Sequence, residues 1–544
     1  MSTKSNLDKA EIGSSTPLLF SRNRVIIETA FYRNNVIKIE SLSHAYELAR
    51  RAKGTIVSDL PVYKAKELGL PNDAKVLLFN DGNITGRQAK ARKLINDYNI
   101  DHYAGILRDS VFNSRSKTMY HASVYVGLHE DFMVRAHLLV PEGYENTLYS
   151  WMLNFQNETT EMNKMYYNST KINEGDIFLY ADPDEFIEGF KDGIAIFDQN
   201  YNCGALLGLR YFGEFKKATL TMAWTIASRF DYTACHGGQK RFNLANGKTF
   251  IAGVFGLSGS GKSTITHSKH HGKFDVTVLH DDAFIISNKD SSSISMEPSY
   301  FDKVQDYPTD SEDNKFLLTM QNVGATYDKS NKLVPVTEDL RNGNGRCLKS
   351  KYWTPHRAYK FDNKIDAIFW IMKDDTLPPI LKINSSILAS TLGATLATKR
   401  SSAEYGVTND KLIIEPYANP FRLYPLKYDY ENFKSLFENN GVDCYVINTG
   451  NFLGKDITPK ITLGLIEEIV TNTISFKQFY HLEELSFVNI NGYSPDFNNS
   501  EYTNLVVKRL KNRISYIHGL NPKNALPDEA AKSIQNIVEK IINK

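Results

Sequence analysis

The chain has 544 residues, of which 42% are hydrophobic, 12% aromatic and 23% charged, with a formal net charge of +2. At roughly 100–200 residues per domain, this length predicts two to four domains, and the near-average apolar content excludes a disordered or low-complexity protein. The balance of 64 basic against 62 acidic residues argues against a dedicated nucleic-acid binder, which carries a larger positive excess.

The N-terminus and the cysteines indicate the compartment. Residues 1–17 are polar and lack the apolar core of a secretory signal, and no apolar run reaches the roughly 20 residues that span a bilayer. Four scattered cysteines, with no CxxC pair, predict neither a zinc knuckle nor a disulfide framework. We therefore expect a cytoplasmic protein, of a size typical of enzymes, with no membrane or nucleic-acid partner.

The first half of the chain mixes strand-like and helical segments without a rule that identifies its fold. Residues 120–126 and 137–140 favour strands, and the polar stretch 157–176 predicts a surface insertion. A polar turn at 243–247 lies just ahead of a strongly apolar run. This turn predicts a domain boundary near residue 245.

The second half alternates apolar runs with helical patterns, which is typical of an α/β nucleotide-binding domain. For the whole chain, the expected fold class is therefore α/β, in a mixed α+β arrangement. The segment 288–314, rich in Ser and Asp, predicts a loop-dominated region. The expected strands are 250–255, 276–279, 367–372 and 444–447, and the expected helices are 387–398, 430–439 and 462–471.

Residues 251–264, IAGVFGLSGSGKST, contain the pattern G-x-x-x-x-G-K-[ST] between a predicted strand and a predicted helix. Glycines let backbone N–H groups converge on phosphate oxygens, so this position favours a phosphate site over a chance Gly/Ser-rich turn. Lys262 would reach the β- and γ-phosphates, and the Ser263 hydroxyl would ligate Mg²⁺. The predicted nucleotide-binding residues here are Gly256, Leu257, Ser258, Gly259, Ser260, Gly261, Lys262, Ser263 and Thr264.

The strand predicted at 276–279 runs into His280, Asp281 and Asp282. Adjacent side chains of an extended segment point in opposite directions, so one carboxylate would face a metal while the other orients a water or a ligand. Alone, the pair is typical of an ordinary turn at a strand end. Next to a P-loop it indicates an NTP-dependent phosphotransferase or an NTPase, and which carboxylate faces which metal stays open.

The form of the P-loop, FGLSGSGKST followed by VLHDD, resembles that of ATP-dependent phosphoenolpyruvate carboxykinase. Other short motifs follow in that family's order, and their collinearity from about residue 85 to 462 carries the resemblance. These motifs are Thr85-Gly86-Arg87, YFGEFKK at 211–217, His236, Asn344-Gly345-Arg346, the segment 368–379 and Asn448-Thr449-Gly450.

The resemblance implies reversible conversion of oxaloacetate and ATP to phosphoenolpyruvate, CO₂ and ADP, as in gluconeogenesis or anaplerosis. It implies a two-lobed enzyme with an oxaloacetate/phosphoenolpyruvate-binding domain at 1–245 and a P-loop ATP-binding domain at 246–544. The active site would lie in the cleft between these domains. ATP, Mn²⁺ and Mg²⁺ are the implied cofactors, and we expect a monomer.

The resemblance also implies roles for single residues. Arg87 would clamp the substrate carboxylate, Tyr211 would lie near the departing CO₂, and Arg346 would neutralise charge between the γ-phosphate and the enolate. The implied catalytic residues are Arg87, Tyr211, Lys217, His236, Lys262 and Arg346, and Thr462 would contact the nucleotide. The implied metal ligands are Lys217, His236, Asp282 and, less directly, Asp281 for Mn²⁺, with Ser263 for Mg²⁺.

Read without the family, these residues have ordinary interpretations. Arg87 could begin an exposed helix, Lys216-Lys217 could be a solvated pair, and His236 could be a hydrogen-bonded structural histidine. Two departures from the family pattern, QAKAR after Gly86-Arg87 and Asp456 where the family has Arg, keep two alternatives open. One is a kinase for another small hydroxy acid or a protein side chain. The other is an ATP-binding regulator without turnover.

Overall fold

A computed structural model describes residues 22–82, 91–172, 174–245, 247–257, 259–304, 307, 311–338, 343–399 and 412–543. These residues divide into two compact units, each formed by segments that are not contiguous in sequence. Unit 1 holds 22–226 and 296–355, and unit 2 holds 227–295, 356–399 and 412–543. The division at residue 245 into a substrate domain and an ATP domain stays a prediction.

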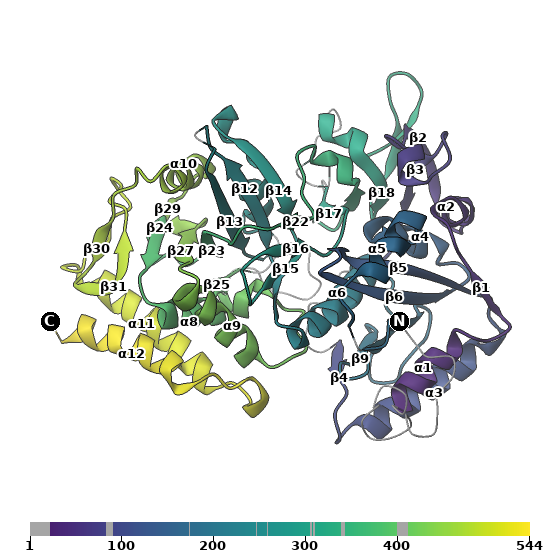
Figure 1. Ribbon diagram of the computed structural model, residues 1–544, viewed down its shortest axis with the longest axis horizontal. Coiled ribbons are helices and arrows are strands. Elements are labelled where there is room, and N and C mark those ends of the chain that lie inside the picture. The colour runs from purple at the N-terminus through teal and green to yellow at the C-terminus, as the bar shows by residue number, and fades with distance from the viewer. Residues whose placement is uncertain are drawn as a thin grey trace. The chain divides into compact units, whose positions relative to one another are not determined.

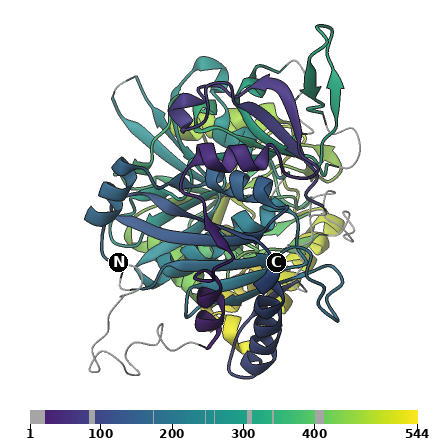
Figure 2. The same ribbon diagram turned by 90° about the vertical axis from the view of Figure 1, so that its right-hand side faces the viewer.

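Unit 1 is built on two mixed sheets, with strand orders β1-β5-β6-β8-β10-β9-β4 (β7 pairing with β5) and β17-β21-β18-β3-β2. Helices α1 and α3 lie side by side in both views (Figures 1 and 2). The helices are α1 (Arg22–Ala30), α2 (Leu42–Ala49), α3 (Ile100–Asn113), α4 (Glu145–Asn154), α5 (Thr160–Asn168) and α6 (Phe212–Arg229). The strands are β1 (Val36–Lys38), β2 (Ile56–Pro61), β3 (Lys75–Phe79), β4 (Arg92–Leu94), β5 (Met119–His129), β6 (Phe132–Pro141), β7 (Gln156–Asn157), β8 (Ile177–Asp182), β9 (Ile194–Asp198), β10 (Cys203–Leu207), β17 (Tyr300–Lys303), β18 (Leu317–Gln321), β19 (Ala325–Tyr327), β20 (Leu333–Pro335) and β21 (Arg346–Lys349).

The longest hairpin of unit 1 joins β5 and β6, which are buried along almost their whole length. Their apolar side chains fill both faces of the larger sheet, and this burial explains why the runs at 120–126 and 137–140 form strands. The polar stretch 157–176 holds α5, none of whose residues is buried. The strands and the surface position predicted for these segments are confirmed.

The smaller sheet of unit 1 gathers the ends of three strands at one edge. β3 and β18 run parallel, with Phe79 opposite Gln321, and β21 runs antiparallel to β18, with Arg346 opposite Gln321. The carboxyl ends of β3 and β18 therefore meet the beginning of β21. The segment that runs into β21, Asn344-Gly345-Arg346, is one of the motifs singled out in the sequence, and the motif Thr85-Gly86-Arg87 lies outside the described residues.

Unit 2 is built on an eight-stranded sheet of order β14-β12-β13-β23-β27-β24-β31-β30 and a smaller sheet of order β11-β15-β16-β22. Its helices are α7 (Lys262–His267), α8 (Ser386–Ala394), α9 (Leu426–Asn439), α10 (Pro459–Val470), α11 (Ser500–His518) and α12 (Asp528–Ile542). Its strands are β11 (Tyr232–His236), β12 (Gly238–Asn243), β13 (Thr249–Phe255), β14 (Asp275–His280), β15 (Ala283–Ser287), β16 (Ser293–Ser295), β22 (Lys360–Phe361), β23 (Ala367–Met372), β24 (Ile380–Ile383), β25 (Ala397–Thr398), β26 (Ile413–Ile414), β27 (Asp443–Asn448), β28 (Asn451–Phe452), β29 (Lys455–Asp456), β30 (Lys477–Phe479) and β31 (Leu482–Phe487). All four strands and all three helices predicted for this half are present, and the helix predicted to reach residue 398 ends at Ala394.

Three adjacent strands of the large sheet, β13, β23 and β27, are mutually parallel. Helix α8 packs against α9 and α12, and α12 packs against α11 (Figure 1). Between strands and helices lies an aromatic cluster, in which the Tyr417 ring stacks on Phe433 and meets Trp370 edge-on. Mixed helices and sheets confirm the predicted α/β class.

The serine-rich segment 288–314 was expected to be loop-dominated, and within its described residues the only strands are the short β16 and β17. Residues 291–300 of this segment are nevertheless all buried. Small serine side chains fit between packed strands when their hydroxyls are hydrogen-bonded. Gln239 Nε2 donates to Ser293 Oγ over 3.0 Å, and Asn440 Nδ2 donates to Ser291 Oγ. Composition alone did not indicate this burial.

The structure also describes the four cysteines and the polarity of the helices. Cys203, Cys235, Cys347 and Cys444 are all buried free thiols. Within the described ranges, every helix is either too short or too polar to cross a membrane.

The aromatic cluster of unit 2 makes a prediction about packing. A Cβ at Gly393 in α8 would lie 2.6 Å from Tyr417 Cε1 and 2.9 Å from Trp370 Cζ2. We expect Gly393→Ala to lower the free energy of unfolding by about 1–3 kcal/mol, as overpacking does. A Cβ at Gly464 in α10 would meet no atom within 4 Å, so the control Gly464→Ala should raise it by about 0.5–1 kcal/mol. Urea denaturation measures the free energy of unfolding of both variants. Changes of the same sign in the two variants would contradict the close packing around Gly393.

Candidate active site

The P-loop joins β13 to α7 at the carboxyl end of the parallel strands. Gly259 and Gly261 have φ angles of 80° and 96°, a region that favours glycine. Gly256 is required for another reason, because a Cβ there would lie 2.3 Å from Ser260 Oγ. Backbone geometry therefore accounts for Gly259 and Gly261, and close side-chain packing accounts for Gly256.

Two neighbouring strand ends support the P-loop. Lys373, directly after β23, donates from Nζ to Gly259 O over 2.9 Å. Thr449, directly after β27, donates from Oγ1 to Ser260 O over 2.7 Å. A planar trans peptide directs its N–H away from its C=O, so a bond to Ser260 O also orients the N–H of Gly261. Lys373 was not singled out in the sequence, whereas Thr449 belongs to the Asn-Thr-Gly motif.

Lys262, the first residue of α7, reaches the turn between β14 and β15. Its buried Nζ donates to Asp281 O and lies 3.8 Å from Asp282 Oδ1. The ammonium group of the P-loop is thus held next to the two carboxylates that follow β14.

Asp281 and Asp282 point to different partners, as alternation along an extended segment predicts. Asp281 Oδ2 lies 3.1 Å from His267 Nε2 at the end of α7. Burial opposes ionisation of Asp281, but the hydrogen bond from His267 and the charges of His267, Lys262 and His280 hold its pKa well below the usual value. Asp282 instead faces Lys262 and His236.

Strand pairing brings His236 beside Asp282. β11 runs antiparallel to β15 with His236 opposite Ala283, and Gly237 N donates to Asp282 O over 3.1 Å. In this register, His236 Nε2 lies 3.1 Å from Asp282 Oδ1. Two residues far apart in sequence therefore present donor atoms to the same point.

The opposite nitrogen of His236 is held by a strained turn. His236 Nδ1 bonds to Ala418 O, and Tyr417 and Ala418 both have left-handed backbone conformations, with φ angles of 52° and 53°. Such conformations cost roughly 1–3 kcal/mol each and persist where surrounding contacts enforce them. The stack of Tyr417 on Phe433 provides such a contact. Because a carbonyl can only accept, Nδ1 carries the proton in this bond.

This arrangement fits a bound cation. With the proton on Nδ1, Nε2 of a neutral ring directs a lone pair at the Asp282 carboxylate, and a cation between the two atoms would relieve that repulsion. Among the described residues, no three His, Cys, Asp or Glu side chains form a metal-binding group.

In unit 1, the YFGEFKK motif forms the beginning of α6. The buried Tyr211 ring folds over Gly213, where a Cβ would lie 2.2 Å from Tyr211 Cε1. Lys216 is fully buried and pairs with Glu297 over 2.9 Å, so it is not the solvated side chain that composition favours. Lys217 is half-buried, with Nζ 5.9 Å from the centre of the Trp224 ring.

Asp81, two residues after β3, contacts one motif segment of unit 1 directly and a second one through Asn322. Its Oδ2 accepts from Phe212 N at the start of α6 over 2.9 Å. Its own N–H donates to Asn322 Oδ1 over 3.1 Å, and Asn322 Nδ2 donates to Gly82 O and, over 3.5 Å, to Asn344 O. Neither Asp81 nor Asn322 was singled out in the sequence, although Asp81 stands four residues before Thr85-Gly86-Arg87.

Burial raises the pKa of Asp81 to about 7, although the hydrogen bonds from Phe212 and Asn322 and the charge of Arg346 lower it. Arg346 itself is buried and donates from Nη1 to Gly343 O and Gly345 O over 2.6 and 2.8 Å. The guanidinium therefore stabilises its own turn as well as the Asp81 carboxylate.

The remaining predicted residues are described one by one. Arg87 and Ser258 lie outside the described residues. Ser263 is partly buried and Thr264 exposed in α7, and Thr462 is buried in the first turn of α10. Asp456 is exposed in β29, and its carbonyl accepts from Tyr493 Oη over 2.7 Å.

Comparison with known proteins extends the sequence resemblance. Residues 66–491 match the family model of phosphoenolpyruvate carboxykinase. The chain is 24% identical over 326 residues to a phosphoenolpyruvate carboxykinase (ATP) of Aeropyrum pernix, covering 57% of this chain and 65% of the relative. Over 260 residues it is 24% identical to the Saccharomyces cerevisiae protein of that name, covering 45% of this chain and 44% of that protein. Over 379 residues it is 23% identical to the Staphylococcus aureus protein (65% of each). The chain thus matches less than two thirds of the length of these relatives.

Asp81 generates a prediction about pH. Its pKa of about 7 in the fold exceeds its ordinary value of 3.8, so the folded state binds more protons than the unfolded state between those values. Stability is therefore lost as pH rises from about 4 through 7. In Asp81→Asn the amide oxygen can still accept from Phe212 N, but the titration is removed. As pH rises from 5 to 8, we expect the free energy of unfolding of the variant to increase by a few kcal/mol relative to that of the parent. Urea denaturation across this range measures the gain, and a difference independent of pH would contradict it.

Proposed function

Because the chain belongs to the phosphoenolpyruvate carboxykinase family, we propose that it is the ATP-dependent enzyme. It would decarboxylate oxaloacetate and phosphorylate the resulting enolate to give phosphoenolpyruvate, CO₂ and ADP. The observation that supports this most directly is the P-loop of unit 2, with Lys262 next to Asp282 and Asp282 next to His236. In this proposal the phosphate site and the cation site would be adjacent within one unit.

The phosphates of ATP would bind along the P-loop. Backbone N–H groups from Gly256 to Thr264 would donate to them, and Lys262 would compensate the charge of the β- and γ-phosphates. Thr462 would contact the nucleotide. These roles need the P-loop carbonyls turned away from the phosphates, and the bonds from Lys373 and Thr449 hold two of them.

The cations would bind at the carboxylates after β14. We assign the direct contact with Mn²⁺ to His236 and Asp282, with Lys217 as the third ligand in its neutral form, and an indirect contact to Asp281. Ser263 would hold Mg²⁺. When bound, these ions supply positive charge that stabilises an enolate and phosphate oxygens. The Ala418 carbonyl would keep the lone pair of His236 Nε2 in the ligating direction.

The substrate would be oriented by unit 1. Arg87 would clamp a carboxylate of oxaloacetate through two parallel hydrogen bonds, and Tyr211 would lie near the carboxylate that leaves as CO₂. After the C–C bond breaks, its electron pair would become the enolate. The enolate oxygen would attack the γ-phosphorus while the bond from that phosphorus to the bridging oxygen breaks and ADP leaves. Arg346 would lower the charge repulsion between the two anions. We place this reaction in gluconeogenesis or anaplerosis, in a cytoplasmic monomer.

The test is formation of phosphoenolpyruvate from oxaloacetate and ATP with Mg²⁺ and Mn²⁺, with GTP in a parallel reaction. We expect product with ATP and a loss of at least about a hundredfold in Lys262→Ala, because charge on the transferred phosphoryl group is then uncompensated. The exposed Lys269 is a matched control, since Lys269→Ala removes a cation near α7 without touching the P-loop.

Absence of product with intact ATP binding would contradict the carboxykinase assignment. In that case, phosphorylation of another hydroxy acid or of a protein side chain would indicate a kinase. ATP binding without any turnover would indicate a regulator. Equal activity in Lys262→Ala and the parent would contradict the phosphate-site assignment.

A further inference from the structure

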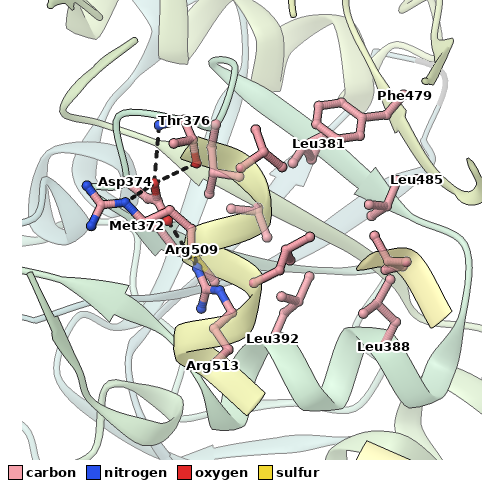
Figure 3. A pocket seen from close by; sticks show the side chains of 15 residues that line it. Met372, Asp374, Thr376, Leu381, Leu388, Leu392, Phe479, Leu485, Arg509 and Arg513 are labelled. Atoms are coloured by element: carbon pink, nitrogen blue, oxygen red, sulfur yellow. Dashed lines mark hydrogen bonds and ion pairs between the residues drawn. The ribbon is translucent and has the colours of Figure 1, made fainter. Parts of the chain in front are cut away.

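Helix α11 carries two arginines that reach the loop after β23. The helix lies beyond residue 491, where the match to the family model ends. Arg513 Nη2 lies 3.4 Å from Asp374 Oδ2, and Arg509 Nε lies 3.6 Å from Asp374 Oδ1 (Figure 3). Arg509 Nη2 also lies 3.0 Å from Asp375 Oδ1. Asp374 is thus held between two guanidinium groups from one helix.

The pair of Arg513 and Asp374 is almost completely buried, with side-chain exposures of 4% and 1%. Arg513 Nη1 also donates to Thr395 O, and Asp374 Oδ1 accepts from Thr376 N and Oγ1 over 3.1 and 2.7 Å. A buried charge that loses its partner is strongly destabilised, so the two groups hold each other in one position.

The residue next to Asp374 contacts the P-loop. Lys373 donates to Gly259 O, as described above, and Met372 O accepts from Thr449 N over 3.1 Å. Asn448 Nδ2 donates to Asp374 O over 2.9 Å. A displacement of Asp374 would therefore move Lys373 and Thr449, the two groups that support the P-loop carbonyls.

The apolar side of α11 borders a cavity. Its other walls include Leu381, Leu388, Leu392, Phe479 and Leu485 (Figure 3). The same side chains belong to one hydrophobic core, against which Leu510 and Ile514 of α11 also pack. The ion pairs of Arg509 and Arg513 with Asp374 add directional contacts to this apolar packing.

We propose that Arg513 and Arg509 are positioning residues for the nucleotide. Through Asp374 they hold the loop whose Lys373 orients the P-loop, so α11 sets the affinity of the P-loop for ATP. The proposal rests on the part of the proposed function that assigns ATP to the P-loop. It does not depend on which acceptor receives the phosphate.

The experiment is equilibrium binding of Mg²⁺-ATP to the full chain, measured by calorimetry well below the melting temperature. We expect Arg513→Gln to raise the dissociation constant by about tenfold, within the range of measured couplings between sites. Arg513→Lys, which keeps the charge but not the planar fork, should recover part of that loss. Arg509→Gln, at a partly exposed position, should raise the constant by about threefold.

Lys540→Ala is the matched control. Lys540 in α12 pairs with Glu484 over 2.6 Å and touches neither Asp374 nor the P-loop, so its loss should leave ATP affinity unchanged. An unchanged affinity in folded Arg513→Gln overturns the proposal. If that variant does not fold, an unchanged affinity in Arg509→Gln overturns it. Because only ATP binding is measured, weaker binding in the variants supports the proposal even where no phosphoenolpyruvate is formed.

Discussion

Parallel pairing of β13, β23 and β27 is the constraint on which the candidate nucleotide site depends. Parallel strands end at the same edge of a sheet, so the segments that follow them must meet there. In this chain those segments are the P-loop, the loop beginning at Lys373 and the turn at Thr449. The last two donate hydrogen bonds to carbonyls of the first. Glycine geometry makes the P-loop possible, and its two neighbours determine which way its peptides face.

Unit 1 uses the same principle with a smaller sheet. The carboxyl ends of β3 and β18 and the beginning of β21 meet at one edge, where Asp81, Asn322 and Arg346 lie. Asp81 links this edge to the start of α6, which carries Lys217 and directly follows Tyr211. A carboxylate buried beside an arginine has a high energetic cost when it is mispaired, which restricts the arrangement of all three segments. Each unit therefore positions its candidate groups through strand order as well as through local motifs.

Local patterns predicted the P-loop, the strand leading to Asp281 and Asp282, and the alternation of strands and helices in unit 2, because each depends on neighbours in sequence. The contacts that were missed act over long separations. Asp81 is 131 residues from Phe212, and the carbonyl of Ala418, which was not predicted as a partner, is 182 residues from the predicted His236. Burial of residues 291–300 and of Lys216 was also missed, because their hydrogen-bonding partners come from other elements. One sequence signal could have predicted Asp81, because it is a polar residue that stands just after a buried strand and just before a recognisable motif.

The central claim is that the edge formed by β13, β23 and β27 binds ATP through its phosphates. Competition measures this most directly: the affinity for Mg²⁺-ATP is determined by calorimetry with and without inorganic tripolyphosphate. The account predicts saturable ATP binding that tripolyphosphate displaces and that Lys262→Ala weakens by at least about tenfold, the loss of one charge-assisted phosphate contact. ATP binding that is insensitive to both tripolyphosphate and Lys262→Ala would contradict it.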